Sequence, residues 1–442
     1  MDMRATLRLE LPAVVAPAEA PRPRLRVAVV TETYPPEVNG AAVTLARAVQ
    51  GLRERGHAVQ LVRPRQRTDD ETVDGDTLLA RSLPIPGYPG LRMGLPAQQV
   101  LRRAWSRQRP DVVHIATEGP LGYGALRTAR ALALPVTSDF RTNFHSYSRH
   151  YGVGWLQRPI AGYLRHFHNA THCTMVPTAK LRDQLEVQGF DRLVVVGRGV
   201  DTAQFDPARR SDERRRQWGA APDDPVAIYV GRLAPEKNLD ALLRAHEAML
   251  VAQPRARLVL VGDGPMREAL RARCPQALFA GEQRDAALAE CYASGDVFLF
   301  PSVTETFGNV TPEAMASGLA VVAFDHAAAS QLITSGHNGY LAPMVDVDAF
   351  VAHAVALVRR LPHARALGRA ARRDALRLGW ERVVDEIEYR LLAAALRSGG
   401  VAAPGTARPS SPAVDLPAHT RPAEAAAART ASWFGARTPS SR

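Results

Sequence analysis

Cysteine and long apolar runs are scarce in this chain of 442 residues. The three cysteines, Cys173, Cys274 and Cys291, lie far apart and form no C-x-x-C pair. We therefore expect neither a disulfide framework nor a cysteine-rich zinc site, and a reducing cytoplasm is the simplest compartment. No stretch approaches the roughly 18 uninterrupted apolar residues of a membrane-spanning helix. The short apolar run 11–18 is interrupted by prolines and follows Glu10, so it does not predict a signal peptide.

Lysine is nearly absent, because only Lys180 and Lys237 are lysines among the 56 basic residues. The net charge is +12, and it is unevenly distributed: residues 25–200 carry +9 and residues 201–397 carry −1. A basic half can attract a phosphorylated substrate or an anionic membrane surface. No nucleic-acid-binding motif is present, so nucleic acid is not an expected partner.

Short β-rich runs alternate with helical patterns in two consecutive blocks, which indicates two domains of βαβ units. A break rich in Asp, Arg and Pro separates the blocks at 201–225. The predicted organisation is a disordered arm (1–24), a first domain (25–200), a second domain (201–379), a C-terminal helix that can cross back to the first domain (380–397), and a disordered tail (398–442). The predicted strands are 26–30, 58–62, 111–115, 135–137, 171–176 and 193–196, then 226–230, 258–261, 277–279, 297–300 and 319–324. Ligands of such sheets bind beyond the carboxyl ends of the strands, so a cleft between the domains is the expected site.

The segment from Pro301 to Glu313 is the richest in functional groups. It follows a predicted strand and contains a helix start near Gly308, whose free N–H groups suit a phosphate. Two carboxylates take different places in it, because Glu305 precedes this helix and Glu313 lies about one turn inside it. For Glu313 alone, a purely structural role in the first turn of the helix stays open.

Cations follow another predicted strand, in the segment Val230-Gly-Arg232-Leu-Ala-Pro-Glu-Lys237-Asn238. Arg232 can grip a phosphate through two hydrogen bonds, and Lys237 supplies a point charge. Since lysine is so rare in this chain, its presence in this turn favours a function over a solvated surface turn.

Two glycine-bearing turns and one polar loop complete the candidate set. Gly40, after the first strand, and Gly262, in Val261-Gly-Asp-Gly-Pro265, would let a diphosphate approach backbone amides closely. Neither turn is a G-x-G-x-x-G dinucleotide motif. The loop from Ser138 to His150 contains Asn143 and His145, which could face an acceptor hydroxyl. The D-x-D sequence at Asp346 precedes a helical pattern, so helix capping is the preferred interpretation over metal binding.

Taken together, these segments resemble the retaining glycosyltransferases of family 4 with the GT-B fold, over roughly residues 25–397. The resemblance rests on the E-x7-E element Glu305–Glu313, the G-R-L-x-x-E-K-N turn Gly231–Asn238, the early Gly40 and Val261–Pro265. Within the family, the chain is most similar to bacterial lipid-directed mannosyl- and glucosyltransferases and to sulfoquinovosyl-diacylglycerol synthases. The resemblance implies an α/β protein with two Rossmann-like domains facing each other across a cleft.

It also implies roles for individual residues. Arg232 and Lys237 would bind the donor diphosphate, Glu313 the nucleotide ribose and Glu305 the donor sugar. The backbone of Phe307, Gly308, Asn309 and Val310 would hold sugar and phosphate oxygens, together with Gly40 and Gly262. No metal and no cofactor are expected, because two cations could replace a divalent ion. Many relatives carry H-T-H in the acceptor loop where this chain reads Arg141-Thr-Asn143, so either Asn143 or His145 could assist catalysis.

The expected function is thus transfer of a mannose- or glucose-type hexose from a nucleotide diphosphate sugar, GDP- or UDP-linked, to a hydroxyl of a lipid or glycolipid. The enzyme would be cytoplasmic and peripheral on the inner face of the cell membrane. Two alternatives remain open: a non-catalytic nucleotide-sugar-binding sensor or scaffold, and a nucleotide-sugar epimerase. No motif decides the base, the donor sugar, the acceptor or the oligomeric state.

Overall fold

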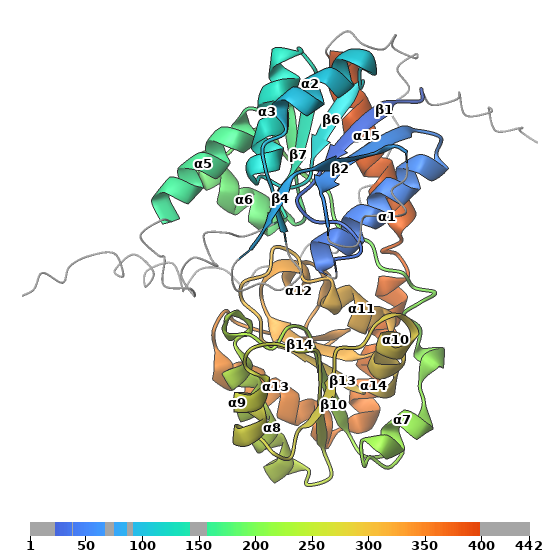
Figure 1. Ribbon diagram of the computed structural model, residues 1–442. Coiled ribbons are helices and arrows are strands. Elements are labelled where there is room, and N and C mark those ends of the chain that lie inside the picture. Colours follow the sequence, from blue (N-terminus) through green and yellow to red (C-terminus); the bar gives the residue numbers. More distant parts are fainter. Residues whose placement is uncertain (1–22, 38, 67–74, 86–91, 142–156, 398–442) are drawn as a thin grey trace, which may run out of the picture. The chain divides into compact units, whose positions relative to one another are not determined.

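The structure is a computed structural model that describes residues 23–37, 39–66, 75–85, 92–141 and 157–397. Within these residues the strands form two parallel sheets and one small antiparallel ribbon (Figure 1). Both sheets belong to one compact unit, Met1–Ala402. The domain boundaries at residues 200 and 379 stay predictions.

The first sheet has seven strands in the order β3-β2-β1-β6-β7-β8-β9. Its strands are β1 (Arg26–Val30), β2 (Ala58–Pro64), β3 (Thr77–Ala80), β6 (Val112–Ile115), β7 (Val136–Asp139), β8 (Cys173–Val176) and β9 (Leu193–Val195). The helices between them are α1 (Gly40–Glu54), α2 (Gln98–Arg107), α3 (Pro120–Ala131), α5 (Gln157–Asn169) and α6 (Ala179–Val187). The ribbon pairs β4 (Ser82–Pro84) with β5 (Arg92–Gly94).

The second sheet has six strands in the order β12-β11-β10-β13-β14-β15. Its strands are β10 (Val226–Val230), β11 (Arg257–Val261), β12 (Leu278–Gly281), β13 (Val297–Phe300), β14 (Ala320–Phe324) and β15 (Gly339–Ala342). Its α-helices are α7 (Asp212–Gln217), α8 (Leu239–Ala252), α9 (Arg267–Arg273), α10 (Asp285–Ser294), α11 (Val310–Ala316), α12 (Ala327–Leu332), α13 (Val347–Arg359) and α14 (Leu361–Ala375), with 3₁₀ turns η2 (Pro207–Arg209) and η3 (Pro235–Lys237). The chain ends its described part in α15 (Trp380–Arg397).

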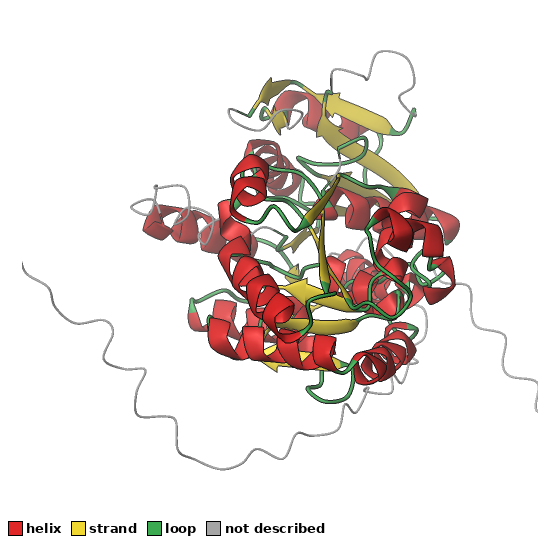
Figure 2. Cartoon of the chain, turned by 90° about the horizontal axis from the view of Figure 1, so that it is seen from below, coloured by secondary structure: helices red, strands yellow, loops and turns green. Residues whose placement is uncertain are grey.

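Each parallel sheet is covered by helices on both faces, as Figure 2 shows, and most of its strand residues are buried. The strands of the second sheet are almost wholly apolar, whereas β7 of the first sheet also buries Thr137, Ser138 and Asp139. In β1, Val27 and Val29 belong to a core cluster with residues of α1 and α15. The alternate residues Ala28 and Val30 belong to a cluster with residues of α2 and α3. This division follows from the two-residue period of a strand, which points successive side chains to opposite faces.

Helix α15 is held on the first sheet by a buried polar contact as well as by apolar packing. The Leu25 N–H donates to His57 Nδ1 at 3.0 Å, so the ring proton lies on Nε2 and donates to Glu388 Oε1 at 3.0 Å. Both side chains are 2% exposed. His57 therefore has a structural role, which agrees with the absence of any site motif around it.

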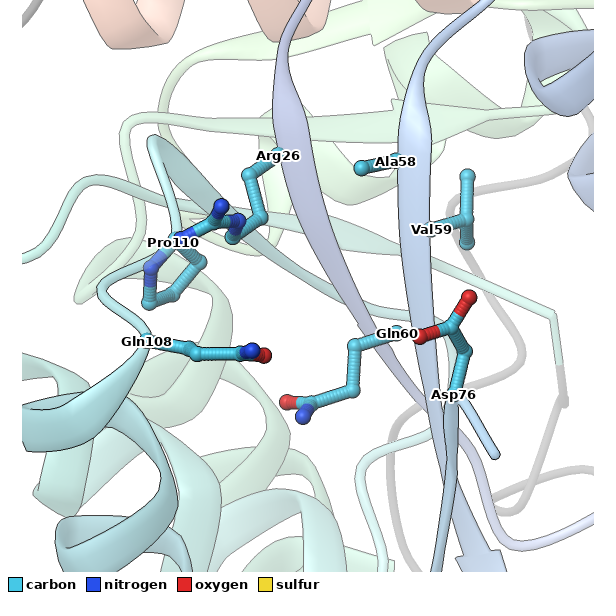
Figure 3. Close-up of a pocket in the computed structure, with 7 residues that line it drawn as sticks. All are labelled: Arg26, Ala58, Val59, Gln60, Asp76, Gln108 and Pro110. Atoms are coloured by element: carbon cyan, nitrogen blue, oxygen red, sulfur yellow. The ribbon is translucent and has the colours of Figure 1, made fainter.

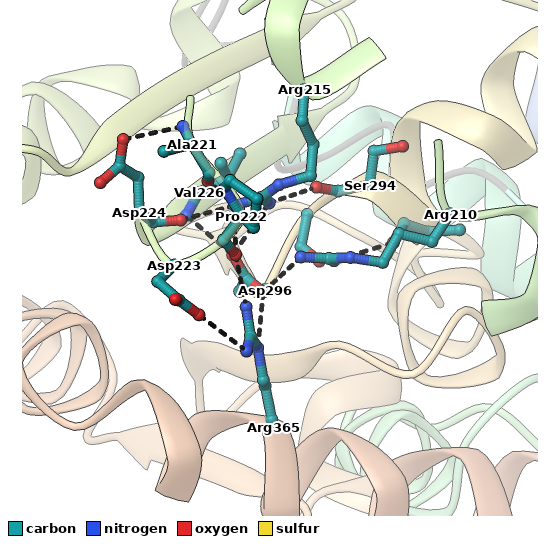
Figure 4. A network of polar contacts seen from close by, with 12 residues as sticks. Arg210, Arg215, Ala221, Pro222, Asp223, Asp224, Val226, Ser294, Asp296 and Arg365 are labelled. Carbon is teal, nitrogen blue, oxygen red and sulfur yellow. Dashed lines mark hydrogen bonds and ion pairs between the residues drawn. The ribbon is translucent and has the colours of Figure 1, made fainter. Parts of the chain in front are cut away.

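In the second domain, the buried carboxylate of Asp296 joins three arginines (Figure 4). Its oxygens lie 3.1 Å from Arg210 Nη2, 3.1 Å from Arg215 Nη1 and 3.3 Å from Arg365 Nε. The Val226 N–H, at the start of β10, also donates to Asp296 at 3.0 Å. One carboxylate thus ties α7 and α14 to the amino ends of β10 and β13.

The predicted strands 26–30, 226–230 and 297–300 coincide with β1, β10 and β13. The capping prediction for Asp346 is also confirmed, because its side chain accepts a hydrogen bond from the Ala349 N–H at 3.0 Å. Strands β3 and β15 were not predicted. Both are edge strands that begin with a residue that is not apolar, Thr77 in β3 and Gly339 in β15, so neither shows a continuous apolar run. The Gly231–Asn238 turn contains the 3₁₀ turn η3, and α8 begins directly after it at Leu239.

Candidate active site

The two motif loops of the second domain leave neighbouring strands. Strand β10 pairs in parallel with β13, and the loop after each strand starts at the same edge of the sheet. The loop after β10 carries Arg232 and Lys237, and the loop after β13 carries Glu305. The topology therefore brings together charged groups that are 68 positions apart in the sequence.

Lys237 and Glu305 form a close, largely buried ion pair. The Lys237 Nζ donates to Glu305 Oε1, the same oxygen that accepts from Ser302 Oγ at 2.9 Å. The side chains are only 13% and 17% exposed. Burial alone would raise the pKa of Glu305, but the Lys237 ammonium and these hydrogen bonds outweigh it and hold that pKa below its ordinary value. Glu305 is thus an ionised group at neutral pH.

Arg232 belongs to the same loop as Lys237 and is more open to solvent. Its side chain is 40% exposed, and its Nη1 lies 3.9 Å from Glu236 Oε1. The Arg232 carbonyl accepts from Tyr229 Oη at 3.1 Å, which fixes the turn from which the guanidinium projects. A half-exposed guanidinium on a fixed turn can reach an anionic ligand.

Gly262 permits the close approach of two loops at this edge. Its φ is +135°, and a Cβ added there would lie 2.0 Å from the carbonyl oxygen of Gly231. Any side chain would therefore separate the loops after β10 and β11. The approach of another loop therefore accounts for a glycine at position 262, and its predicted contact with a donor diphosphate stays a prediction.

Glu313 occupies a separate, partly buried position on α11. Its Oε2 accepts from Tyr292 Oη, on α10, at 2.9 Å. Burial raises the pKa of Glu313 to about 7, and the Tyr292 hydrogen bond opposes that rise only in part. The pKa values of the two carboxylates of the E-x7-E element therefore shift in opposite directions, because among the described residues a cation lies beside Glu305 and none is recorded beside Glu313.

The loop between the two carboxylates has little freedom. Gly308 has a φ of +88°, Phe307 is 6% exposed, and Val310 packs against the core of the second domain. The carbonyl of Phe307 accepts from the Ala328 N–H at 2.8 Å. That carbonyl is engaged within the protein, so ligand contacts of this loop would use its N–H groups.

The same loop contacts the first domain at two points. Asn309 Nδ2 donates to the Gly40 carbonyl at 3.3 Å, and Thr306 Oγ1 donates to the Arg141 carbonyl at 2.9 Å. A Cβ added to Gly40 would lie 3.1 Å from Asn309 Nδ2. Gly40 therefore lies next to the E-x7-E loop, whereas Asn143 and His145 lie outside the described residues.

His326 and Tyr292 adjoin the site but were not predicted. The backbone carbonyl of Glu305 accepts from His326 Nε2 at 3.0 Å, and burial lowers the pKa of His326. The sequence feature that could have pointed to His326 is its position just after β14, the neighbour of β13. Tyr292 carried no signal, because it lies within a helix with no motif around it.

A hollow elsewhere does not compete with this site. It lies at the amino ends of β1 and β2 and is lined by Arg26, Ala58, Val59, Gln60, Asp76, Gln108 and Pro110 (Figure 3). Ligands of parallel sheets bind at the opposite ends of the strands. Among the described residues, no cluster of three or more His, Cys, Asp or Glu could hold a metal ion. In the same part of the chain, no helix combines the length and apolarity needed to span a membrane.

Known proteins resemble this chain over most of its length. The family described as "Glycosyltransferase Family 4" matches residues 38–204, and "Glycosyl transferases group 1" matches residues 224–360. A GDP-mannose-dependent alpha-mannosyltransferase of Mycolicibacterium smegmatis is 36% identical over 372 residues, covering 82% of this chain and 96% of the relative. A sulfoquinovosyl transferase of Arabidopsis thaliana is 31% identical, covering 86% of this chain and 76% of the relative.

Solved structures agree on the fold. A sucrose-phosphate synthase from Thermosynechococcus elongatus superposes with a TM-score of 0.67 at 18% identity, covering 84% of this chain and all of that one. An Anabaena protein crystallised with UDP and glucose superposes with a TM-score of 0.66 at 16% identity and the same coverage. With two Rossmann-like sheets, the E-x7-E loop beside the G-R-L-x-x-E-K-N turn, and relatives above 30% identity, this chain belongs to glycosyltransferase family 4 and has the GT-B fold.

Proposed function

We propose that this protein transfers a mannose- or glucose-type hexose from a nucleotide diphosphate sugar to a hydroxyl of a lipid or glycolipid, with retention of configuration and without a divalent metal. The observation that carries the proposal is the ion pair between Lys237 and Glu305, which joins the loops after β10 and β13, with Arg232 in the first of these loops. The relatives support the donor and acceptor classes, since their names include GDP-mannose-dependent mannosyltransferases and an alpha-monoglucosyldiacylglycerol synthase of Acholeplasma laidlawii, 26% identical.

Each residue has a role that follows from its surroundings. Breaking the bond between sugar and phosphate leaves negative charge on the diphosphate, and Arg232 and Lys237 are placed to stabilise that charge. Glu305, ionised and fixed by Lys237 and Ser302, accepts hydrogen bonds from donor-sugar hydroxyls. The N–H groups from Phe307 to Val310, with Gly40 opposite, contact sugar and phosphate oxygens. Asn143 or His145 would assist on the acceptor side.

Glu313 would hold the nucleotide ribose, and this role predicts a pH dependence of binding. The ionised carboxylate can accept hydrogen bonds from both ribose hydroxyls. Because the pKa of Glu313 is about 7, the ionised fraction decreases as the pH falls below 7. Nucleotide affinity should therefore weaken as the pH falls below 7, approaching tenfold per pH unit, and binding near pH 7 should release a proton. Isothermal titration calorimetry between pH 5.5 and 8.5 measures both effects.

The Glu313→Gln variant isolates the source of this dependence. It should bind the nucleotide about tenfold more weakly at pH 8 because one hydrogen-bond acceptor is lost. It should also bind with little change in affinity across the pH range. An unaltered pH profile in this variant would remove Glu313 from the ribose site.

A panel of UDP, GDP, ADP and their hexose conjugates, each with and without magnesium, tests the donor. A ligand present at 100 times its dissociation constant should stabilise the protein by about 2.7 kcal/mol, which thermal unfolding detects. We expect one base class to stabilise the protein equally in both conditions, and its hexose conjugate to yield a glycosylated lipid. Absence of any shift would contradict a nucleotide-sugar site, and binding without product would favour a sensor or scaffold.

The basic first domain is proposed to place the enzyme on an anionic membrane surface. Residues 25–200 carry a net charge of +9, and such a surface attracts basic protein faces with a strength that falls as salt is added. Peripheral association at the cytoplasmic face would give the active site access to a lipid acceptor.

A further inference from the structure

Four buried charged side chains lie together at the carboxyl ends of the first sheet. Glu118 follows β6, Asp139 ends β7, Arg141 is two residues further along, and Arg198 follows β9. Their exposed fractions are 2%, 2%, 9% and 8%. Strands β6 to β9 are consecutive in the sheet, so these residues share one edge. We call this set the first-domain polar cluster.

The charged groups are unevenly paired. Arg141 Nη2 makes a close ion pair with Asp139 Oδ2, and Arg198 Nη2 lies 4.0 Å from the same oxygen. His114 Nε2 also faces that oxygen, at 3.7 Å. Burial alone would raise the pKa of Asp139, but Arg141 above all drives that pKa well below its ordinary value. A single oxygen of this carboxylate thus faces both arginines.

Several buried polar atoms of the cluster have no hydrogen-bond partner within the described residues. They are Asp139 Oδ1, both carboxyl oxygens of Glu118, and Arg141 Nε. Orphaned buried polar groups destabilise the folded state, and natural proteins rarely keep several together without a reason. Here the unused groups include acceptors and a donor.

This mixture selects among ligand chemistries. An anion would satisfy only the Arg141 donor, and a cation would satisfy only the carboxyl oxygens. A hydroxyl both donates and accepts, so a group with several hydroxyls can satisfy both kinds of atom. Burial also raises the pKa of Glu118 to about 8, which leaves much of this acid protonated at neutral pH and able to donate to a hydroxyl as well.

The polar cluster adjoins the donor loop. Arg141 accepts from Thr306 Oγ1 through its carbonyl and donates from Nη1 to Thr44 Oγ1 at 2.7 Å. Thr44 in turn donates to the Gly40 carbonyl at 2.9 Å, and that carbonyl also accepts from Asn309. A short series of hydrogen bonds thus connects the cluster with the E-x7-E loop.

We propose that the first-domain polar cluster binds the hydroxyls of a glycosyl headgroup on the acceptor, so that the preferred acceptor is a glycolipid rather than bare diacylglycerol. This inference rests on the proposed hexosyl transfer and names the substrate class on its acceptor side. Glu118 and Arg198 would be specificity-determining residues, because bare diacylglycerol offers only one hydroxyl and leaves most of the cluster unpaired.

The sharpest test replaces Glu118 by leucine, which keeps the volume and removes the unpaired carboxyl. If the cluster serves a ligand, Glu118→Leu should leave the melting temperature unchanged or raise it, since a buried group without partners is lost. It should lower kcat/KM for a glycosyl-diacylglycerol at least tenfold. Hydrolysis of the donor by water, which needs no acceptor subsite, should stay within twofold of wild type, as should nucleotide affinity. Arg198→Met should likewise lower kcat/KM for the glycosyl-diacylglycerol while donor hydrolysis and nucleotide affinity stay within twofold of wild type.

Glu388→Leu is the matched control, because Glu388 is an equally buried glutamate of the same domain but is bonded to His57. It should lower the melting temperature and leave acceptor KM unchanged. The inference is overturned if Glu118→Leu destabilises the protein without altering acceptor kinetics, or if wild type prefers diacylglycerol to glycosyl-diacylglycerol. Wild-type protein that neither hydrolyses a donor nor binds any nucleotide would instead contradict the proposed function itself.

Discussion

Replacing Lys237 with alanine is expected to lower kcat for hexosyl transfer by about 10²–10³-fold, the usual effect of removing one preorganised charge-stabilising donor. In the proposed reaction, Lys237 and Arg232 would stabilise the charge that develops on the departing diphosphate. Lys237 also holds Glu305 ionised, as the lowered pKa of that carboxyl indicates, so its loss affects the donor-sugar contact too. Steady-state assays with saturating acceptor measure the loss.

A double variant separates this effect from misfolding. In Lys237→Ala, Glu305 stays buried without its counter-ion, which itself destabilises a protein. The Lys237→Met/Glu305→Gln pair removes both charges and should recover most of the melting temperature without recovering activity. Arg244→Ala is the surface control: Arg244 is 57% exposed, pairs with Asp348, and its loss should change kcat less than twofold. Near-normal kcat in Lys237→Ala would remove the lysine from charge stabilisation.

Replacing Asp296 with alanine is expected to destabilise the second domain by about 3–5 kcal/mol, because it leaves a buried charge without its partner. Arg215 is the critical partner, since its side chain is 2% exposed and its Nη1 bonds to Asp296 at 3.1 Å. The Val226 N–H would also lose its acceptor at the start of β10. Urea unfolding of the full chain, followed by fluorescence and circular dichroism together, measures the change and detects separate unfolding of the two domains.

The partners of Asp296 provide the comparison. Arg365 is 37% exposed, so Arg365→Ala should cost less than 1 kcal/mol. The double variant Asp296→Leu/Arg215→Met removes both buried charges and should be more stable than Asp296→Ala alone. If Asp296→Ala unfolds at the wild-type urea concentration, Asp296 does not stabilise this domain.

Local sequence patterns were enough to locate the strongly apolar strands and the motif-rich loops of this protein. Continuous apolar runs predicted β1, β10 and β13 because a parallel strand covered by helices on both faces has no polar side. The E-x7-E element and the G-R-L-x-x-E-K-N turn each follow such a strand, so their place at a sheet edge was also predictable. Family membership followed from the same segments.

Tertiary structure alone decided which of these groups meet. The order of β10 and β13 in the sheet pairs Lys237 with Glu305, and the packing of α10 against α11 gives Glu313 its bond from Tyr292. The opposite pKa shifts of the two glutamates follow from those contacts and not from their spacing. The unpaired carboxyl of Glu118 was equally invisible, because burial and the absence of a partner are properties of the folded neighbours. A sequence pattern reports local periodicity, whereas these contacts join segments that are remote along the chain.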